Sequence, residues 1–80
     1  MILEIISPEK IVFTGEVSSV AVPGVDGEFE MLNNHAPIIS ILEKGHIKVV
    51  DNNNEEKLIE INGGSIEMSH NKITILAQES

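Results

Sequence analysis

The sequence KLIEINGGSIEMSHNKITILA, residues 57–77, alternates apolar and polar side chains in three consecutive segments. The alternating apolar residues are Ile59 and Ile61, then Ile66 and Met68, then Ile73, Ile75 and Ala77. Because side chains on a β-strand point alternately to opposite faces, each segment is predicted to bury one face and expose the other. Asn62-Gly63-Gly64 and Ser69-His70-Asn71 are predicted to form the turns between these strands.

Similar short apolar segments, each ended by turn-forming residues, occur along the rest of the chain. Together they predict about nine strands, at residues 2–6, 11–13, 17–22, 29–32, 38–42, 47–50, 57–61, 66–68 and 73–77. A break in the alternation at Val17-Ser18-Ser19-Val20 predicts a β-bulge near Ser18. No long stretch shows helical periodicity, and no linker or repeat divides the chain. The sequence therefore predicts a single all-β domain over residues 1–80, a β-sandwich or flattened barrel.

The composition limits the classes of partner. A formal net charge of −8 argues against binding to nucleic acid or to anionic lipid, since both require a basic surface. No apolar run approaches the ~18 residues of a membrane-spanning helix, so direct lipid insertion is not expected. The start of the chain lacks the basic region of a secretory signal, which favours a cytoplasmic location. With only two phenylalanines as aromatic residues, the core is predicted to consist of Ile, Val, Leu and Met.

Residue types used in catalysis and metal binding are present, but not in the pattern of a known site. Ser40, His35 and Asp26 could supply a nucleophile, a base and an acid, but such a triad is defined by its geometry. The three histidines are far apart in the sequence and lack the spacing of paired metal ligands. The acidic and amide residues at 51–56 lack the glycine of a calcium-binding loop. The sequence therefore predicts no catalytic residue, no metal site and no cofactor.

Four passages resemble the N-terminal domain of the epsilon subunit of F-type ATP synthase. The central passage, VPGVDGEF at residues 22–29 followed by HAPI at 35–38, is the most specific of them. The others are SPEKIVFTGEV at 7–17, INGGSIEM at 61–68 and NKITILA at 71–77. They occur in the order and at the spacing typical of that family, and they cover nearly all of the chain.

The resemblance implies a β-sandwich of about ten strands, which agrees with the strand pattern. It also implies a non-catalytic subunit of the central stalk, or rotor, on the cytoplasmic face of the inner membrane. The implied partners are the gamma subunit and the membrane ring of c subunits. Such a subunit fastens gamma to the c ring, so that ion-driven rotation of the ring turns gamma inside the catalytic head.

Particular residues fall on family positions that face these partners. Glu28, with Asp26 in the same turn, is expected to face the c ring, whose polar loops carry basic and amide groups. Ser7, His35 and Ser40 fall on positions that the family directs toward gamma.

Other apolar residues are assigned by their place in the pattern. Phe29 and Leu32 are expected in the core. Ile2, Ile6 and Val50 are apolar residues expected on outer strand faces, where they are natural contact candidates.

The chain departs from the family pattern at two places. Asn33-Asn34 replaces the usual Pro-Gly, although asparagine also adopts left-handed turns, so the corner is expected to persist. The helical hairpin that follows the sandwich in the family, and that inhibits ATP hydrolysis, would need residues after Ser80. The expectation is a subunit without this inhibitory arm. A free-standing β-sandwich that binds a small ligand or a cation remains the alternative interpretation.

Overall fold

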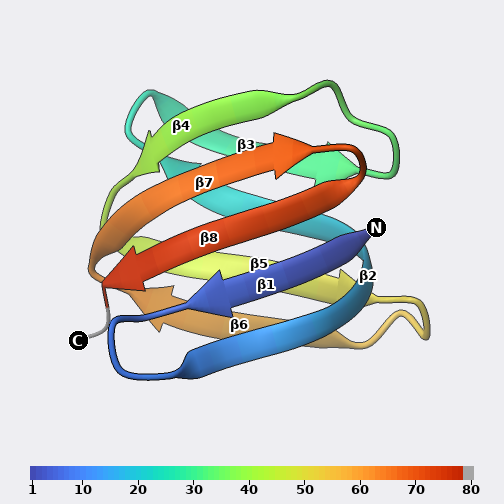
Figure 1. Ribbon diagram of the computed structural model, residues 1–80, viewed down its shortest axis with the longest axis horizontal. Coiled ribbons are helices and arrows are strands. Elements are labelled where there is room, and N and C mark those ends of the chain that lie inside the picture. Colours follow the sequence, from blue (N-terminus) through green and yellow to red (C-terminus); the bar gives the residue numbers. More distant parts are fainter. Residues whose placement is uncertain (79–80) are drawn as a thin grey trace.

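The computed structural model describes residues 1–78, and within this range it contains eight β-strands and no helix (Figure 1). This confirms the predicted all-β fold, with slightly fewer strands than expected. The strands are β1 (Ile2–Ile6), β2 (Ile11–Gly24), β3 (Gly27–Leu32), β4 (Ile38–Leu42), β5 (Gly45–Asp51), β6 (Glu56–Ile61), β7 (Gly63–Ser69) and β8 (Lys72–Gln78).

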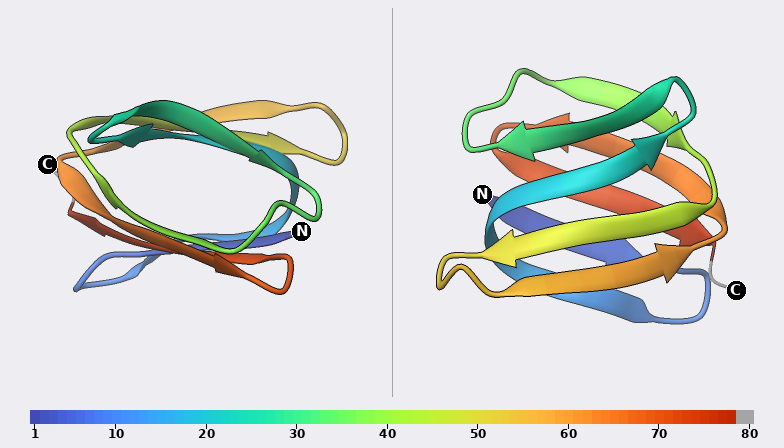
Figure 2. Two further views of the ribbon diagram at one scale, coloured as in Figure 1. Left: turned by 90° about the horizontal axis from the view of Figure 1, so that it is seen from above. Right: turned by 180° about the vertical axis from the view of Figure 1, so that it is seen from behind.

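The strands form two layers, and β2 belongs to both of them (Figure 2). The front layer of Figure 1 has the order β4-β7-β8-β1, followed by the first half of β2. The back layer contains β3, the second half of β2, β5 and β6. A one-residue pairing between Gly24 of β2 and Leu42 of β4 joins the layers at one corner. The sheet therefore closes unevenly, as a flattened barrel.

Strand β2 corrects the predicted strand count. Residues 11–13 and 17–22 were expected to form two strands, but they form one continuous strand. Thr14 and Gly15, expected to break it, pair with Glu4 and Leu3 of β1. The predicted bulge is confirmed, because the β2–β5 register shifts between Val17 and Ser19.

The bulge allows β2 to pass from the front layer to the back layer. The residue between the two register positions is Ser18, and its Oγ lies 3.1 Å from the carbonyl oxygen of Val50 and 3.2 Å from that of Asp51. The Ser18 hydroxyl thus joins the bulge to β5, at the point where the first half of β2 ends its pairing with β1.

The core lies between the two layers and receives apolar side chains from every strand. It contains Ile, Val, Leu, Met and Ala, as the composition predicted: Met1, Leu3, Ile5, Val17, Val20, Val22, Met31, Leu42, Ile47, Val49, Ile59, Ile61, Ile66, Met68, Ile73, Ile75 and Ala77. The alternating residues of 57–77 are all among them, so the predicted faces are confirmed.

One predicted core residue is exposed. Leu32 is 56% exposed, whereas its neighbour Met31 is fully buried. The register explains the difference, because Met31 pairs with the buried Val20 and Leu32 pairs with Ser19 on the opposite face. Phe29 pairs with the buried Val22 and packs against the core, as expected.

Asparagines form the turns at one end of the sandwich. Asn34, Asn54 and Asn71 have φ values of 64°, 63° and 60°, in the left-handed region that asparagine tolerates. The N–H of Asn34 donates to Oδ1 of Asn71 at 2.9 Å, and Oδ1 of Asn33 accepts from the amino group of Met1 at 2.7 Å. The corner expected at Asn33-Asn34 is therefore present and is tied to two neighbouring segments.

The glycines at 63 and 64 belong to β7, not to a turn as the sequence suggested. Gly64 has a φ of 153° and lies in register between Leu42 of β4 and Ala77 of β8. A Cβ atom on Gly64 would lie 2.1 Å from the carbonyl oxygen of Leu76. A side chain is thus excluded by the close approach of β8.

Candidate interaction surfaces

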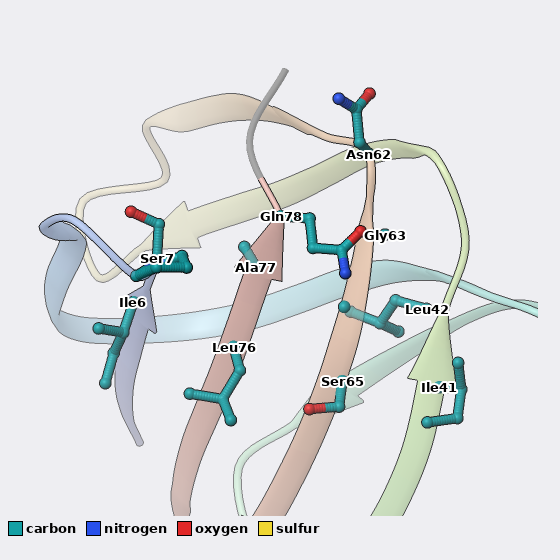
Figure 3. Close-up of a pocket in the computed structure, with 12 residues that line it drawn as sticks. Ile6, Ser7, Ile41, Leu42, Asn62, Gly63, Ser65, Leu76, Ala77 and Gln78 are labelled. Carbon is teal, nitrogen blue, oxygen red and sulfur yellow. The ribbon is translucent and has the colours of Figure 1, made fainter.

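The front layer carries a row of largely apolar side chains on its outer face. Register aligns Ile6 of β1, Leu76 of β8, Ser65 of β7 and Ile41 of β4, which we call the outer row. Figure 3 shows these side chains on neighbouring strands. Leu76 and Ile41 are 56% and 58% exposed, and Ile39, on the same face of β4, is 76% exposed. Exposed apolar residues that gather in this way are typical of protein–protein contact surfaces.

A shallow hollow of about 590 Å³ is lined by the outer row and by residues beyond it, among them Ser7, Asn62 and Gln78 (Figure 3). Its polar side chains are those of Ser7, Asn62, Ser65 and Gln78, and the remainder of its lining is mainly apolar. The Ser7 hydroxyl already donates to the carbonyl oxygen of Lys10 at 3.3 Å. No charged side chain among the described residues lines this hollow.

The back layer has a different outer face, which carries two exposed leucines, Leu32 and Leu58, and has charges on each side of Leu58. Leu58 of β6 is 64% exposed and pairs with Lys48 of β5. Lys48 Nζ lies 3.6 Å from the Glu56 carboxylate, and His46 Nε2 lies 3.9 Å from that of Glu60. The two layers therefore present chemically distinct surfaces, one apolar along its row and one charged.

Asp26 and Glu28 both lie at the turn between β2 and β3, and both are exposed. The turn has a rigid base. The N–H of Val25 donates to the carbonyl oxygen of Ile41 at 3.1 Å, and the N–H of Glu43 donates to that of Pro23 at 2.8 Å. The structure thus brings the two acids together on one fixed projection. That they face a c ring stays a prediction.

Ser7, His35 and Ser40 are spread over the front layer and are not gathered at one point. Ser7 is buried in the turn after β1, and His35 is exposed in the loop before β4, at the opposite end of the layer in Figure 1. Ser40 is half-buried, and it pairs with Ile66, whose side chain is in the core. Only an extended partner could contact all three positions, and their contact with gamma stays a prediction.

Several exposed apolar residues of the front layer were not identified from the sequence. Ile2 and Ile6 were expected as contact candidates, but Ile11, Ile39, Ile41 and Leu76 were not. A signal was present, because the segment IISIL at 38–42 is apolar on both faces of its strand. The sequence could not show which of the two faces is covered.

Residues 1–78 contain neither a group of metal ligands nor a membrane-spanning helix. No three His, Asp or Glu side chains in this range lie close enough together to hold a metal ion. None of the described segments is a helix long and apolar enough to span a bilayer.

These observations define a small β-sandwich domain with an apolar row on one outer face, a charged opposite face and a projecting acidic turn. Residues 1–80 match the sequence model of the family described as "ATP synthase, Delta/Epsilon chain, beta-sandwich domain". The chain belongs to this family, which confirms the resemblance seen in the sequence.

Individual relatives agree with this assignment. The ATP synthase epsilon chain of Rhodopseudomonas palustris (strain BisA53) is 40% identical over 74 residues, which cover 92% of this chain and 54% of the relative. The epsilon chain of Chlorobium limicola is 38% identical over 77 residues, which cover 96% of this chain and 88% of the relative. The chain thus spans about half the length of the first relative and most of the second.

A solved structure supports the fold. A chain in the cryo-EM structure of the Euglena gracilis mitochondrial ATP synthase, described as OSCP/F1/c-ring in rotational state 1, superimposes with a TM-score of 0.93. The superposition covers 99% of this chain and 51% of that chain, at 20% sequence identity. At this level of identity the likeness shows the shared β-sandwich and no more.

Proposed function

We propose that this chain is a non-catalytic rotor subunit of an F-type ATP synthase. It fastens the gamma subunit to the c ring and so couples ion-driven rotation to ATP synthesis. The observation that carries the proposal is the family match over residues 1–80. The structure supports it with a surface suited to docking, made of the outer row and the acidic turn. The complex lies on the membrane, and this subunit sits peripherally on its cytoplasmic face.

The front layer is the proposed gamma-binding face. Its outer row offers apolar area, and Ser7, His35 and Ser40 lie along the same layer. An interface of standard size covers about 800 Å² on each partner. The chain exposes 4822 Å² in total, so gamma and the c ring can occupy separate parts of its surface.

The acidic turn is the proposed contact with the c ring. Asp26 and Glu28 project from a base held by main-chain hydrogen bonds, so the backbone of the turn holds both acids at one corner of the domain. A ring surface with basic groups would be attracted by these carboxylates, and the attraction would set the orientation of docking as well as its strength.

Replacing Glu28 with lysine is expected to weaken attachment of the chain–gamma complex to purified c rings by about tenfold, or ~1.4 kcal/mol. Affinity for gamma alone should be unchanged, because Glu28 lies on β3 in the back layer. Glu55→Lys is the matched control, since Glu55 is also an exposed acid, in the loop between β5 and β6 at the other end of the sandwich. Equal ring binding by the two variants, measured by co-sedimentation, would refute the assignment of this turn.

The coupling role is tested in membrane vesicles that lack this chain. We expect ATP synthesis driven by an ion gradient to be almost absent in such vesicles and to return when purified chain is added. The chain alone should hydrolyse no ATP. Unchanged synthesis without the chain would disprove the coupling role.

A further inference from the structure

Strand β4 is the one strand without a charged residue among the eight of the described chain. Its sequence is IISIL, and it forms the outer edge of the front layer, beyond β7 (Figure 1). The strands at the edges of the back layer differ, because β3 carries two glutamates and β6 carries two glutamates and a lysine. Natural proteins place charges on edge strands to prevent pairing with other chains, and β4 lacks this protection.

The main chain of β4 is open along its first half. Near the C-terminal end of β4, the carbonyl oxygen of Ile41 faces away from β7, because it accepts a hydrogen bond from the N–H of Val25. Main-chain groups two residues apart in an antiparallel strand point the same way, so the N–H and C=O of Ile39 also face away from β7. β3 and the first part of β4 do not pair, so no described strand covers this edge at Ile39.

We propose that β4 receives an extended segment of the gamma subunit as an added strand, paired with the main chain of Ile39. This inference rests on the proposed function, since it takes gamma as the partner of the front layer. Strand addition is a general way in which an exposed sheet edge binds a peptide segment.

The surroundings of the edge define the chemistry of that segment. The outer row ends at Ile41, and Ile39 extends its apolar character to the open edge, so a strand added there would continue the proposed gamma-binding face. Glu67 pairs with Ile39 on the neighbouring strand, and Glu43 follows β4 directly. A segment that fits places an apolar side chain beside Ile39 and lysine or arginine near Glu67, since the edge at Ile41 and Glu43 is occupied by Val25 and Pro23.

Ile39→Pro tests the pairing directly, because it removes an N–H that β7 does not use. Proline is tolerated on an edge strand where its position faces solvent. Ile39→Ala is the matched control, which removes most of the same side chain and keeps the N–H. We expect Ile39→Pro to bind purified gamma at least about tenfold more weakly than Ile39→Ala, a difference of ~1.4 kcal/mol.

A second measurement uses the wild-type chain and does not depend on how the proline variant folds. Hydrogen exchange at residues 38–40 should slow at least about tenfold when gamma is bound, because the Ile39 N–H then donates to the added strand. Equal affinity of the two variants, or unchanged exchange at these residues in the gamma complex, would overturn strand addition while leaving gamma binding intact. Wild-type chain that does not bind gamma would overturn both proposals. If the wild-type chain associates with itself and Ile39→Pro does not, the strand added to β4 comes from a second copy of this chain. That result would contradict the inference.

Discussion

Replacing Gly64 with alanine is expected to lower the free energy of unfolding by about 3 kcal/mol or more. The new Cβ would lie 2.1 Å from the carbonyl oxygen of Leu76 and 3.1 Å from Cα of Ala77, both main-chain atoms of β8. This steric clash can be relieved only if β7 and β8 move apart. β7 also joins β4 to the rest of the front layer, so the displacement would affect the pairing of β4 as well. The whole stability of a domain of this length is about 4–12 kcal/mol, so the loss is a large fraction of it.

Gly27→Ala is the matched control for this prediction. Gly27 also has a positive φ, of 126°, but nothing lies within 4 Å of the position that its Cβ would occupy. Only the backbone strain remains there, about 1–2 kcal/mol. Urea denaturation should therefore show a clearly lower midpoint for Gly64→Ala than for Gly27→Ala. Equal midpoints would mean that β8 does not approach β7 as closely as the structure shows.

Leu76→Asp is expected to weaken binding to gamma by at least about thirtyfold, or ~2 kcal/mol. Leu76 lies in the outer row between Ile6 and Ser65, so the proposed interface would bury the new carboxylate among apolar groups. A buried charge without a partner is costly, and the cost appears only in the complex because the side chain is exposed in the free chain. Isothermal titration with purified gamma measures the effect.

Leu58→Asp provides the control for Leu76→Asp. Both leucines are outward-facing, lie within a strand and are more than half exposed, at 64% and 56%. Any general cost of an aspartate in a strand is shared by the two variants. Leu58 belongs to the charged back layer, beside Lys48, so its replacement should leave gamma affinity within about twofold of wild type. An equal loss of gamma affinity in Leu76→Asp and Leu58→Asp would show that gamma does not bind preferentially to the front layer.

Much of the fold could be predicted because its signals are local. The segments between 57 and 77 alternate with a period of two, and burial of one face then follows from the geometry of a strand. The bulge at Ser18 was likewise visible as a break in alternation. The asparagine turns were predicted because asparagine itself tolerates the left-handed conformation found at Asn34.

The remaining features depend on pairing between distant segments. Thr14 and Gly15 continue β2 because they pair with β1. The residues of β1 that pair with them lie earlier in the chain, so the local sequence around Thr14 does not reveal the pairing. Leu32 faces outward because the register with β2 assigns Met31 to the core. Alternation along the strand already places Leu32 on the same face as Glu28 and Glu30, a signal that the expectation of a buried Leu32 did not use. Gly64 was assigned to a turn because the sequence around it does not reveal that β8 closely approaches the backbone of Gly64.

The candidate interaction surfaces could be predicted only in part, because some of their residues are neighbours in the sequence and others are brought together by strand pairing. Asp26 and Glu28 are neighbours in sequence, so their presence on one turn needed no tertiary information. The outer row combines residues from four strands, and the register alone places Leu76 beside Ile6. The sequence showed that 38–42 is apolar on both faces, but the uncovered edge of β4 follows from the topology of the sheet.

Stable association with gamma tests the central claim most directly. Purified chain and purified gamma from the same organism are mixed at low salt and separated by size-exclusion chromatography. We expect a complex with one copy of each, and the addition of c rings should shift that complex to larger size. Separate elution of the chain and gamma at micromolar concentration would contradict the account.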